Sequence, residues 1–221
     1  GLNKSEHGLL DETEPTVALS WAEAQAAMEA GAVLLDGRDP EDFARGYLEG
    51  SINVGLNGRY AEFAGSIVPV DMDIVVVVEP GAELEAKNRL ARIGFDRVLG
   101  HVEAPYGVMQ SNPEDAGIAS RLTAEQLVDR LAQDDSVQLV DVRGPGECES
   151  AGVIGGALNM PVATVRSQLD DLNPDLPTVV YCAGGYRSSV VASMLRAEGF
   201  ADVSDLIGGF GAWAPEGACA S

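Results

Sequence analysis

One cysteine in this chain has the sequence neighbours of a nucleophile. Cys182 follows an apolar, β-branched run at residues 177–181 and precedes two glycines, an arginine and two serines, where a helix is expected to begin. Glycines let the backbone curl around a side chain, and N–H groups at a helix N-terminus favour an anion there. Thiolate is the reactive form of cysteine, so this setting predicts a reactive thiol. The expected loop consists of Ala183, Gly184, Gly185, Tyr186 and Arg187, with Ser188 and Ser189 capping the helix or contacting the sulfur.

The remaining cysteines and the histidines lack sequence neighbours that would indicate a catalytic or metal-binding role. Cys148 follows the turn at residues 144–146 and is interpreted as structural, whereas Cys219 lies near the chain end and is expected in an exposed tail. His7 and His101 are far from any cysteine in sequence, and no C-x-x-C pair occurs. We therefore expect no metal site and no cofactor, and the sequence gives no support for a Cys–His catalytic pair.

The composition excludes several classes of protein. With 14 basic and 35 acidic residues the net charge is −21, which argues against a nucleic-acid partner. No apolar run reaches the roughly 20 residues that a bilayer requires, and no basic segment followed by an apolar one opens the chain. We therefore expect a cytoplasmic protein without a membrane partner.

A repeat organises the chain. Asp36 and Asp141 stand 105 residues apart in matching apolar segments, and Gly94 and Gly199 have the same separation. A period of this size corresponds to a whole domain. The expected division is a tail or upstream linker at residues 1–15, a first domain at 16–110, a linker at 111–120, a second domain at 121–216 and a tail at 217–221.

Each repeat alternates short apolar runs with helical patterns. Capping boxes begin the first helix of each copy, at Ser20-x-x-Glu23 and Thr123-x-x-Gln126. Later helices are expected at residues 82–92 and 188–197. Such alternation indicates an α/β fold with two doubly wound domains, each a small central parallel sheet flanked by helices.

The second repeat resembles a rhodanese domain. The resemblance rests on Asp141-Val142-Arg143 with Glu147, on residues 152–161, on the loop at 182–187 and on the closing segment 208–213. Val153 stands where the family pattern usually has histidine, a departure at a position generally regarded as structural.

The first repeat resembles the same family through residues 36–38 and 42–54, but its loop at residues 77–82 contains no cysteine. The resemblance extends over about residues 16–216. It implies one inactive and one active domain. Residues 57–65 also resemble the tail of proteins in which a metallo-β-lactamase-like persulfide dioxygenase precedes rhodanese repeats, so such an upstream domain is a possible partner.

The resemblance implies a sulfurtransferase. Cys182 would carry a sulfane sulfur as a persulfide, taken from thiosulfate or a low-molecular-weight persulfide and passed to a thiol or to cyanide. The residues Asp141, Arg143 and Glu147 are expected to form a supporting polar network under the loop. The high negative charge of the protein disfavours the dianion thiosulfate as donor, unless Arg143, Arg166 and Arg187 create a local positive funnel. The charge therefore favours an organic persulfide as the donor.

Two alternatives remain open. One is a cysteine-dependent phosphatase or arsenate reductase, whose loop resembles this one but has the longer spacing C-x5-R, against C-x4-R from Cys182 to Arg187. The other is a non-catalytic rhodanese-like module that binds or senses a partner. Formation of a persulfide on Cys182 would support the sulfurtransferase over both of these alternatives.

Overall fold

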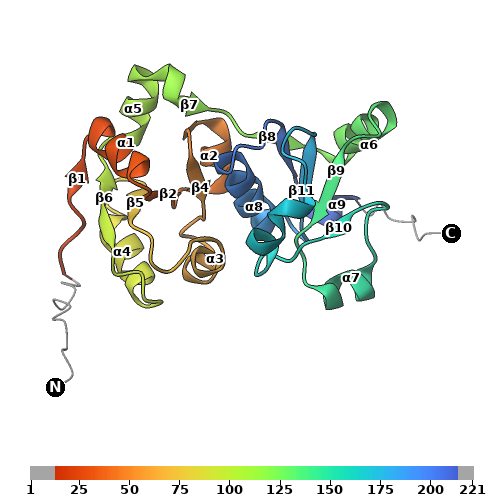
Figure 1. The fold of residues 1–221 in the computed structure, drawn as a ribbon, viewed down its shortest axis with the longest axis horizontal. Coiled ribbons are helices and arrows are strands. Elements are labelled where there is room, and N and C mark those ends of the chain that lie inside the picture. Colours follow the sequence, from red (N-terminus) through yellow and green to blue (C-terminus); the bar gives the residue numbers. More distant parts are fainter. Residues whose placement is uncertain (1–12, 214–221) are drawn as a thin grey trace.

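The computed structural model describes residues 13–213, which form two α/β domains (Figure 1). The first domain contains a five-stranded parallel sheet with the strand order β1-β6-β5-β2-β4. In chain order its elements are β1 (Ala18–Leu19), α1 (Trp21–Glu29), β2 (Val33–Asp36), α2 (Pro40–Arg45), β3 (Tyr47–Leu48), β4 (Ser51–Asn53), α3 (Tyr60–Ile67), β5 (Ile74–Val77), α4 (Glu83–Ala91), β6 (Val98–Val102) and α5 (Pro105–Ser111).

The second domain repeats this topology. Its sheet has the order β10-β9-β11-β12-β8, which is the order of the first sheet read from the opposite edge, and its strand pairs are again parallel. The expected fold class, two small parallel sheets flanked by helices, is therefore confirmed. The elements are β8 (Ser120–Leu122), α6 (Ala124–Gln133), β9 (Gln138–Asp141), α7 (Pro145–Ala151), β10 (Leu158–Asn159), η2 (Val165–Asp171), β11 (Thr178–Tyr181), α8 (Tyr186–Ala197), β12 (Val203–Leu206) and α9 (Gly209–Trp213).

Both predicted capping boxes are present. The Ser20 N–H donates to Glu23 Oε2 at 2.8 Å, and the Thr123 N–H donates to Gln126 Oε1 at 2.8 Å. These bonds satisfy backbone donors that a helix start would otherwise leave free. Helix α8 begins at Tyr186, two residues before the predicted start, because Gly185 adopts the left-handed conformation and ends the loop there.

The segment expected to be a linker is instead folded onto the first domain. It forms the 3-10 helix η1 (Pro113–Asp115) and strand β7 (Ala116–Gly117), which pairs antiparallel with β3. Asp115 Oδ2 accepts hydrogen bonds from Trp21 Nε1 at 2.7 Å and from Gln25 Nε2 at 3.1 Å. A polar residue of this segment therefore fixes the segment to helix α1 of the first domain.

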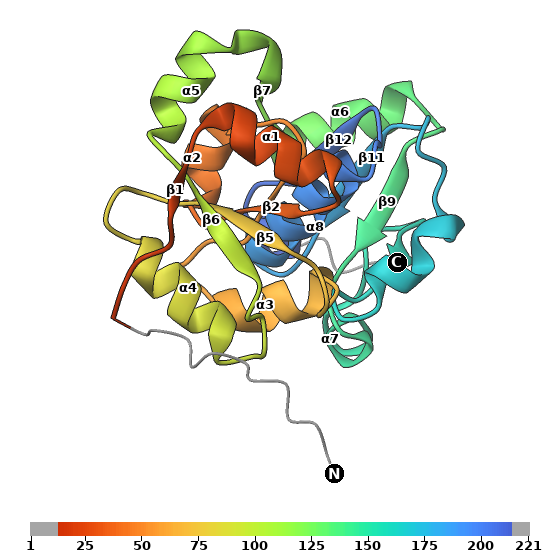
Figure 2. The ribbon, with the colours of Figure 1, turned by 60° about the vertical axis from the view of Figure 1, so that its left-hand side comes forward.

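Helix α8 belongs to the second domain and lies between the two sheets, as Figures 1 and 2 show. Its residues 188–195 are all buried, and one hydrophobic cluster joins Val190 of α8 with Ile52 of β4. The Asn53 N–H of β4 donates to Ser193 Oγ of α8 at 2.8 Å. The domains thus share a core, with one face of α8 against its own sheet. None of the helices within residues 13–213 is long and apolar enough to cross a membrane.

Candidate active site

Strand β11 delivers Cys182 to the carboxyl edge of the second sheet, where open α/β sheets bind ligands. The side chain is only 2% exposed. Its Sγ accepts the Gly185 N–H at 3.1 Å, and Gly185 is the N-cap of α8. Sulfur therefore lies at a helix N-terminus with a backbone donor aimed at it, an arrangement suited to a thiolate or another anion.

Helix α9 holds the loop in this orientation. The Phe210 N–H donates to Cys182 O at 2.7 Å, and the Gly211 N–H donates to Ala183 O at 3.1 Å. The carbonyl groups of the loop are thus directed at α9. Gly209 has a φ of +58°, and a Cβ there would lie 2.3 Å from Cys182 O. Only glycine fits this contact, and the dipeptide Gly208-Gly209 was the sequence signal for it.

The two serines after Arg187 have different positions. Ser188 is buried, and its Oγ lies 3.6 Å from Cys182 Sγ while donating to Gly185 O at 2.9 Å. Ser189 Oγ donates to Tyr186 O at 2.8 Å, a local bond within the helix. Ser188 is therefore the serine that contacts the sulfur, and Ser189 supports the first turn of α8.

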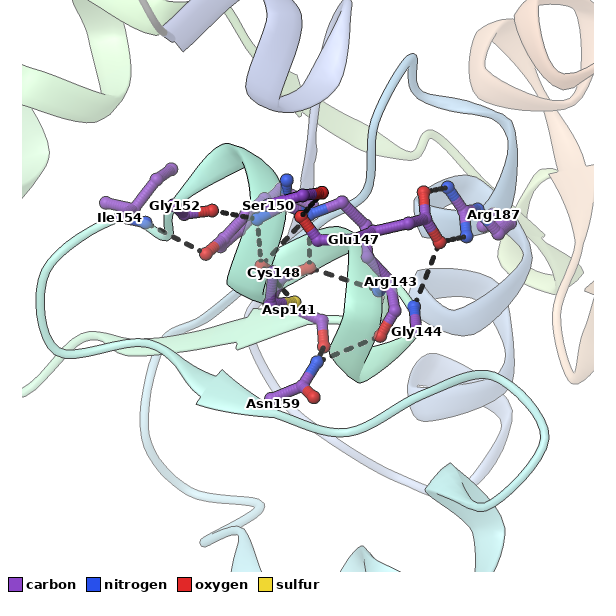
Figure 3. A network of polar contacts seen from close by, with 11 residues as sticks. Asp141, Arg143, Gly144, Glu147, Cys148, Ser150, Gly152, Ile154, Asn159 and Arg187 are labelled. Atoms are coloured by element: carbon purple, nitrogen blue, oxygen red, sulfur yellow. Dashed lines mark hydrogen bonds and ion pairs between the residues drawn. The ribbon is translucent and has the colours of Figure 1, made fainter. Parts of the chain in front are cut away.

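Arg187 does not point freely into the site. Its two terminal nitrogens donate to the Glu147 carboxylate at 2.6 and 2.7 Å, and Glu147 Oε2 also accepts the Gly144 N–H at 3.0 Å (Figure 3). The Arg187 guanidinium lowers the pKa of Glu147 to about 2, so the carboxylate is charged near neutral pH. This bidentate pair ties α7 to the sulfur loop and neutralises the charge of Arg187 locally.

Asp141 and Arg143 form a buried network beside the loop (Figure 3). Arg143 Nη2 donates to Asp141 Oδ2 at 2.6 Å and to Gly152 O at 2.7 Å. Burial raises the pKa of Asp141, but hydrogen bonds from Arg143 outweigh this effect and hold it below the usual value. The Arg143 guanidinium also lies 4.2 Å from the Phe210 ring centroid. The contacts of this network therefore reach α9 and the turn after α7.

The sequence left open whether three arginines create a local positive funnel, and each of them has an acidic partner. Arg143 pairs with Asp141, and Arg187 pairs with Glu147. Arg166 pairs with Glu198 at 2.8 Å and donates through Nε to Ile67 O at 2.6 Å. The positive charge of each of these three side chains is therefore compensated locally.

A cavity of about 450 Å³ opens over Cys182, and both domains line it. The second domain contributes Glu147, Gly184, Tyr186 and Arg187, and the first contributes Arg59 and Phe63. Contacts that reach the cavity from more than a hundred residues away have no local pattern, so the sequence did not identify these first-domain residues as part of a site. Residues 57–65 had been noted only for their resemblance to longer proteins.

The remaining candidates lie away from the thiol chemistry or outside the described residues. Cys148 is on α7, and its Sγ lies 3.5 Å from Asp141 Oδ2. Burial raises the pKa of this thiol, and the nearby Asp141 charge acts in the same direction. His7 and Cys219 lie outside the described residues, as do most of the expected N-terminal tail and the whole of the C-terminal one. Among residues 13–213, no group of three or more His, Cys, Asp or Glu is arranged to hold a metal.

Comparisons with known proteins match each repeat. Residues 20–103 and 123–216 match the family described as Rhodanese-like domain. A sulfurtransferase of Allochromatium vinosum is 34% identical over 100 residues, covering 45% of this chain and 92% of that protein. Thiosulfate sulfurtransferase GlpE of Shewanella oneidensis is 38% identical over 92 residues, covering 42% of this chain and 89% of that protein. The crystal structure of a rhodanese-like domain protein from Staphylococcus aureus has 35% identity and a TM-score of 0.41, covering 44% of this chain and 94% of that chain.

Proposed function

Because the chain belongs to the rhodanese-like domain family, with two copies of the domain, we propose that it is a sulfurtransferase that carries sulfur as a persulfide on Cys182. The observation that carries this proposal is the Gly185 N–H, which donates to Cys182 Sγ at 3.1 Å at the N-terminus of α8. Both relatives described above bear the name sulfurtransferase, and one of them is named thiosulfate sulfurtransferase. The proposed donor is thiosulfate or a low-molecular-weight persulfide, and the acceptor is a thiol or cyanide.

In the first half-reaction, the Cys182 thiolate attacks the outer sulfur of the donor. A new S–S bond forms on Cys182 while the donor S–S bond breaks, and its electron pair leaves with the inner group. Thiosulfate releases sulfite, and an organic persulfide releases the corresponding thiolate. The charge is conserved in both cases, and no external oxidant or reductant is needed.

In the second half-reaction, the acceptor thiolate or cyanide attacks the terminal sulfur of the Cys182 persulfide. The bond between the two sulfurs breaks, and Cys182 leaves as the thiolate that began the cycle. We assign the backbone N–H groups of the loop from Ala183 to Tyr186 to stabilising the terminal sulfur anion. We assign the same task to the Ser188 hydroxyl, 3.6 Å from Sγ, whose proton must first turn from Gly185 O towards the sulfur.

Arg187, Asp141, Arg143 and Glu147 support the loop in this proposal. Glu147 holds Arg187, and Asp141 holds Arg143. We therefore assign Asp141, Arg143 and Glu147 to the shape of the loop. Arg187 also lines the cavity and interacts with Cys182, so we assign it to both loop shape and anion binding.

The test is a measurement of intact mass without reductant. The protein is incubated with thiosulfate and, separately, with glutathione persulfide, and a gain of about 32 Da marks one added sulfur. We expect the gain to disappear in Cys182→Ser and to persist in Cys148→Ser, the matched control with the other described free thiol. A gain that survives Cys182→Ser overturns the proposal.

The same preparation separates the alternatives. Hydrolysis of a phosphate ester or reduction of arsenate, without a gain of sulfur, would support the phosphatase or reductase alternative. No reaction at all would support a non-catalytic binding module. An upstream persulfide dioxygenase domain and a cytoplasmic location stay predictions from the sequence.

A further inference from the structure

The first domain has no thiol in its loop, but it forms one wall of the cavity over Cys182. Arg59 and Phe63 come from the start of α3, and both line the cavity together with Tyr186 of the sulfur loop. We propose that this wall selects the donor: Arg59 binds a carboxylate of an organic persulfide, and Phe63 contacts its carbon chain. The inference deepens the proposed sulfurtransferase function and rests on it.

The wall is fixed in place by several contacts with Tyr186. The Tyr186 hydroxyl donates to Gly55 O at 2.8 Å, and its ring centroid lies 5.6 Å from that of Phe63. A Cβ on Gly58 would lie 2.4 Å from the Tyr186 ring, so a larger residue there would displace the ring. The segment from Gly55 to Phe63 therefore packs closely against the residue that follows the Gly185 N-cap.

Helix α4 holds the same segment from behind. Arg89 Nη2 donates to Gly58 O at 2.8 Å, and Arg89 Nη1 donates to Leu56 O. These bonds fix the backbone on the N-terminal side of Arg59, and α3 begins directly after it. The fold thus fixes the backbone from which the Arg59 side chain extends, while the side chain itself is 70% exposed.

Arg59 retains donors for a ligand. Its guanidinium pairs through Nη2 with Glu62, whose side chain is also largely exposed, and it lies 5.7 Å from the Phe63 ring centroid. An ion pair between two exposed side chains is weak, and a guanidinium has five N–H donors that suit a carboxylate. Since Arg187 is already held bidentately by Glu147, Arg59 is the cavity arginine with the more replaceable partner.

The wall combines a cation with an aromatic surface. The Arg59 guanidinium lies 5.7 Å from the Phe63 ring centroid, and that centroid lies 5.6 Å from the centroid of the Tyr186 ring. All three residues line the cavity that also contains Cys182. A persulfide on a short peptide or amino acid can place its sulfane sulfur at Cys182 and a carboxylate at Arg59.

The test compares Arg59→Ala with Arg45→Ala. Arg45 is also 70% exposed on the first domain and paired with acidic neighbours, but it lines a different pocket, so both variants lose one positive charge. The rate of sulfur gain is measured with glutathione persulfide and with the uncharged 2-hydroxyethyl persulfide. We expect Arg59→Ala to raise KM for glutathione persulfide about tenfold, the size of one charged hydrogen bond, and to leave kcat unchanged.

Arg59→Lys is expected to recover part of this loss, and KM for 2-hydroxyethyl persulfide is expected to change less than about twofold. Equal effects on both donors, an equal effect of Arg45→Ala, or a larger loss with thiosulfate than with glutathione persulfide would each overturn the inference.

A binding measurement keeps this inference separate from the proposed function. In the Cys182→Ser background, the Kd of S-methylglutathione is measured with Arg59 intact and with Arg59→Ala added. A Kd about tenfold weaker only in the Arg59 variant supports the carboxylate site even if no donor loads the wild-type protein. An unchanged Kd overturns it even if Cys182 accepts sulfur readily.

Discussion

The loops that follow β5 and β11 have the same length and opposite chemistry. Strand registers align Val77 with Asp36 and Tyr181 with Asp141, so Val78 corresponds to Cys182. Four residues separate Val78 from Glu83 in the first domain, and four separate Cys182 from its counterpart Arg187 in the second. The glycine before these helices has a φ of +94° at Gly81 and +105° at Gly185.

The N–H group of that glycine has a different acceptor in each domain. Gly185 donates to the Cys182 sulfur, whereas Gly81 donates to both oxygens of the Glu83 carboxylate at 3.0 and 2.9 Å. The first domain therefore fills its own anion site with a side chain. The comparison shows that the fold supplies a backbone anion site in both copies, and that the side chains at two positions decide what occupies it.

The largest expected effect concerns a feature that the two domains share. Asp36→Ala and Asp141→Ala each leave a buried arginine without its carboxylate, and we expect each to lower the free energy of unfolding by about 3–5 kcal/mol. Urea denaturation measures this. A loss of sulfur transfer in Asp141→Ala without a loss of stability would give Asp141 a direct catalytic role and break the comparison.

Substitution of Gly81 and of Gly185 separates an effect on stability from an effect on sulfur transfer. Gly81→Ala and Gly185→Ala both force alanine into the left-handed region, and each is expected to cost about 1–2 kcal/mol of stability. Only Gly185→Ala is expected to slow sulfur gain, because it displaces the N–H that faces Cys182. If Gly81→Ala slows transfer equally, the effect comes from stability alone.

An exchange of loop chemistry sharpens the comparison further. In a Cys182→Ser background, Val78→Cys puts a thiol in the first loop, but we expect it to gain sulfur slowly because the Glu83 carboxylate occupies the anion site. Adding Glu83→Arg is expected to accelerate the gain about tenfold by replacing a like charge with an opposite one. Intact mass over time measures both, and rapid loading of Val78→Cys alone would contradict this account.

The smallest expected effect is a pH dependence. The pKa of Glu147 is lowered to about 2, so its pair with Arg187 stabilises the protein above about pH 4.5 and is lost as the pH falls towards 2. Since the carboxylate is 45% exposed, we expect Glu147→Gln to cost less than about 1 kcal/mol at pH 7.

Urea denaturation at pH 7, 4 and 2.5 should show that cost shrinking towards zero. Asp42→Asn is the counterpart change, because Asp42 occupies the matching position of the first domain and pairs with Arg45 at 2.6 Å on the same helix. A cost for Glu147→Gln that does not depend on pH would contradict the assigned ion pair.

Local patterns in the sequence were sufficient for the fold. The 105-residue repeat predicted two similar domains because matching short segments recur at one spacing. The capping boxes at Ser20 and Thr123 predicted two helix starts because each box is complete within four residues. The neighbours of Cys182 likewise predicted a loop at a helix N-terminus. Helix starts and tight loops could be predicted because the residues that determine them are neighbours in the sequence.

Contacts between distant segments could not be predicted in this way. Glu147 lies 40 residues from Arg187, and their pairing depends on how α7 packs beside α8. The wall formed by Arg59 and Phe63 depends on the docking of one domain against the other. The packing of the segment between the repeats could not be predicted either, because Asp115 accepts its hydrogen bond from Trp21, 94 residues away in sequence.

The contact between Asn53 and Ser193 has a consequence for association between molecules. Strand β4 is one of the two edge strands of the first sheet, and an uncovered edge strand can pair with a strand from another chain and start aggregation. Helix α8 lies against this edge, and Ser193 accepts a hydrogen bond from one of its backbone N–H groups. The second domain thus covers this edge of the first domain and keeps it from pairing with another molecule.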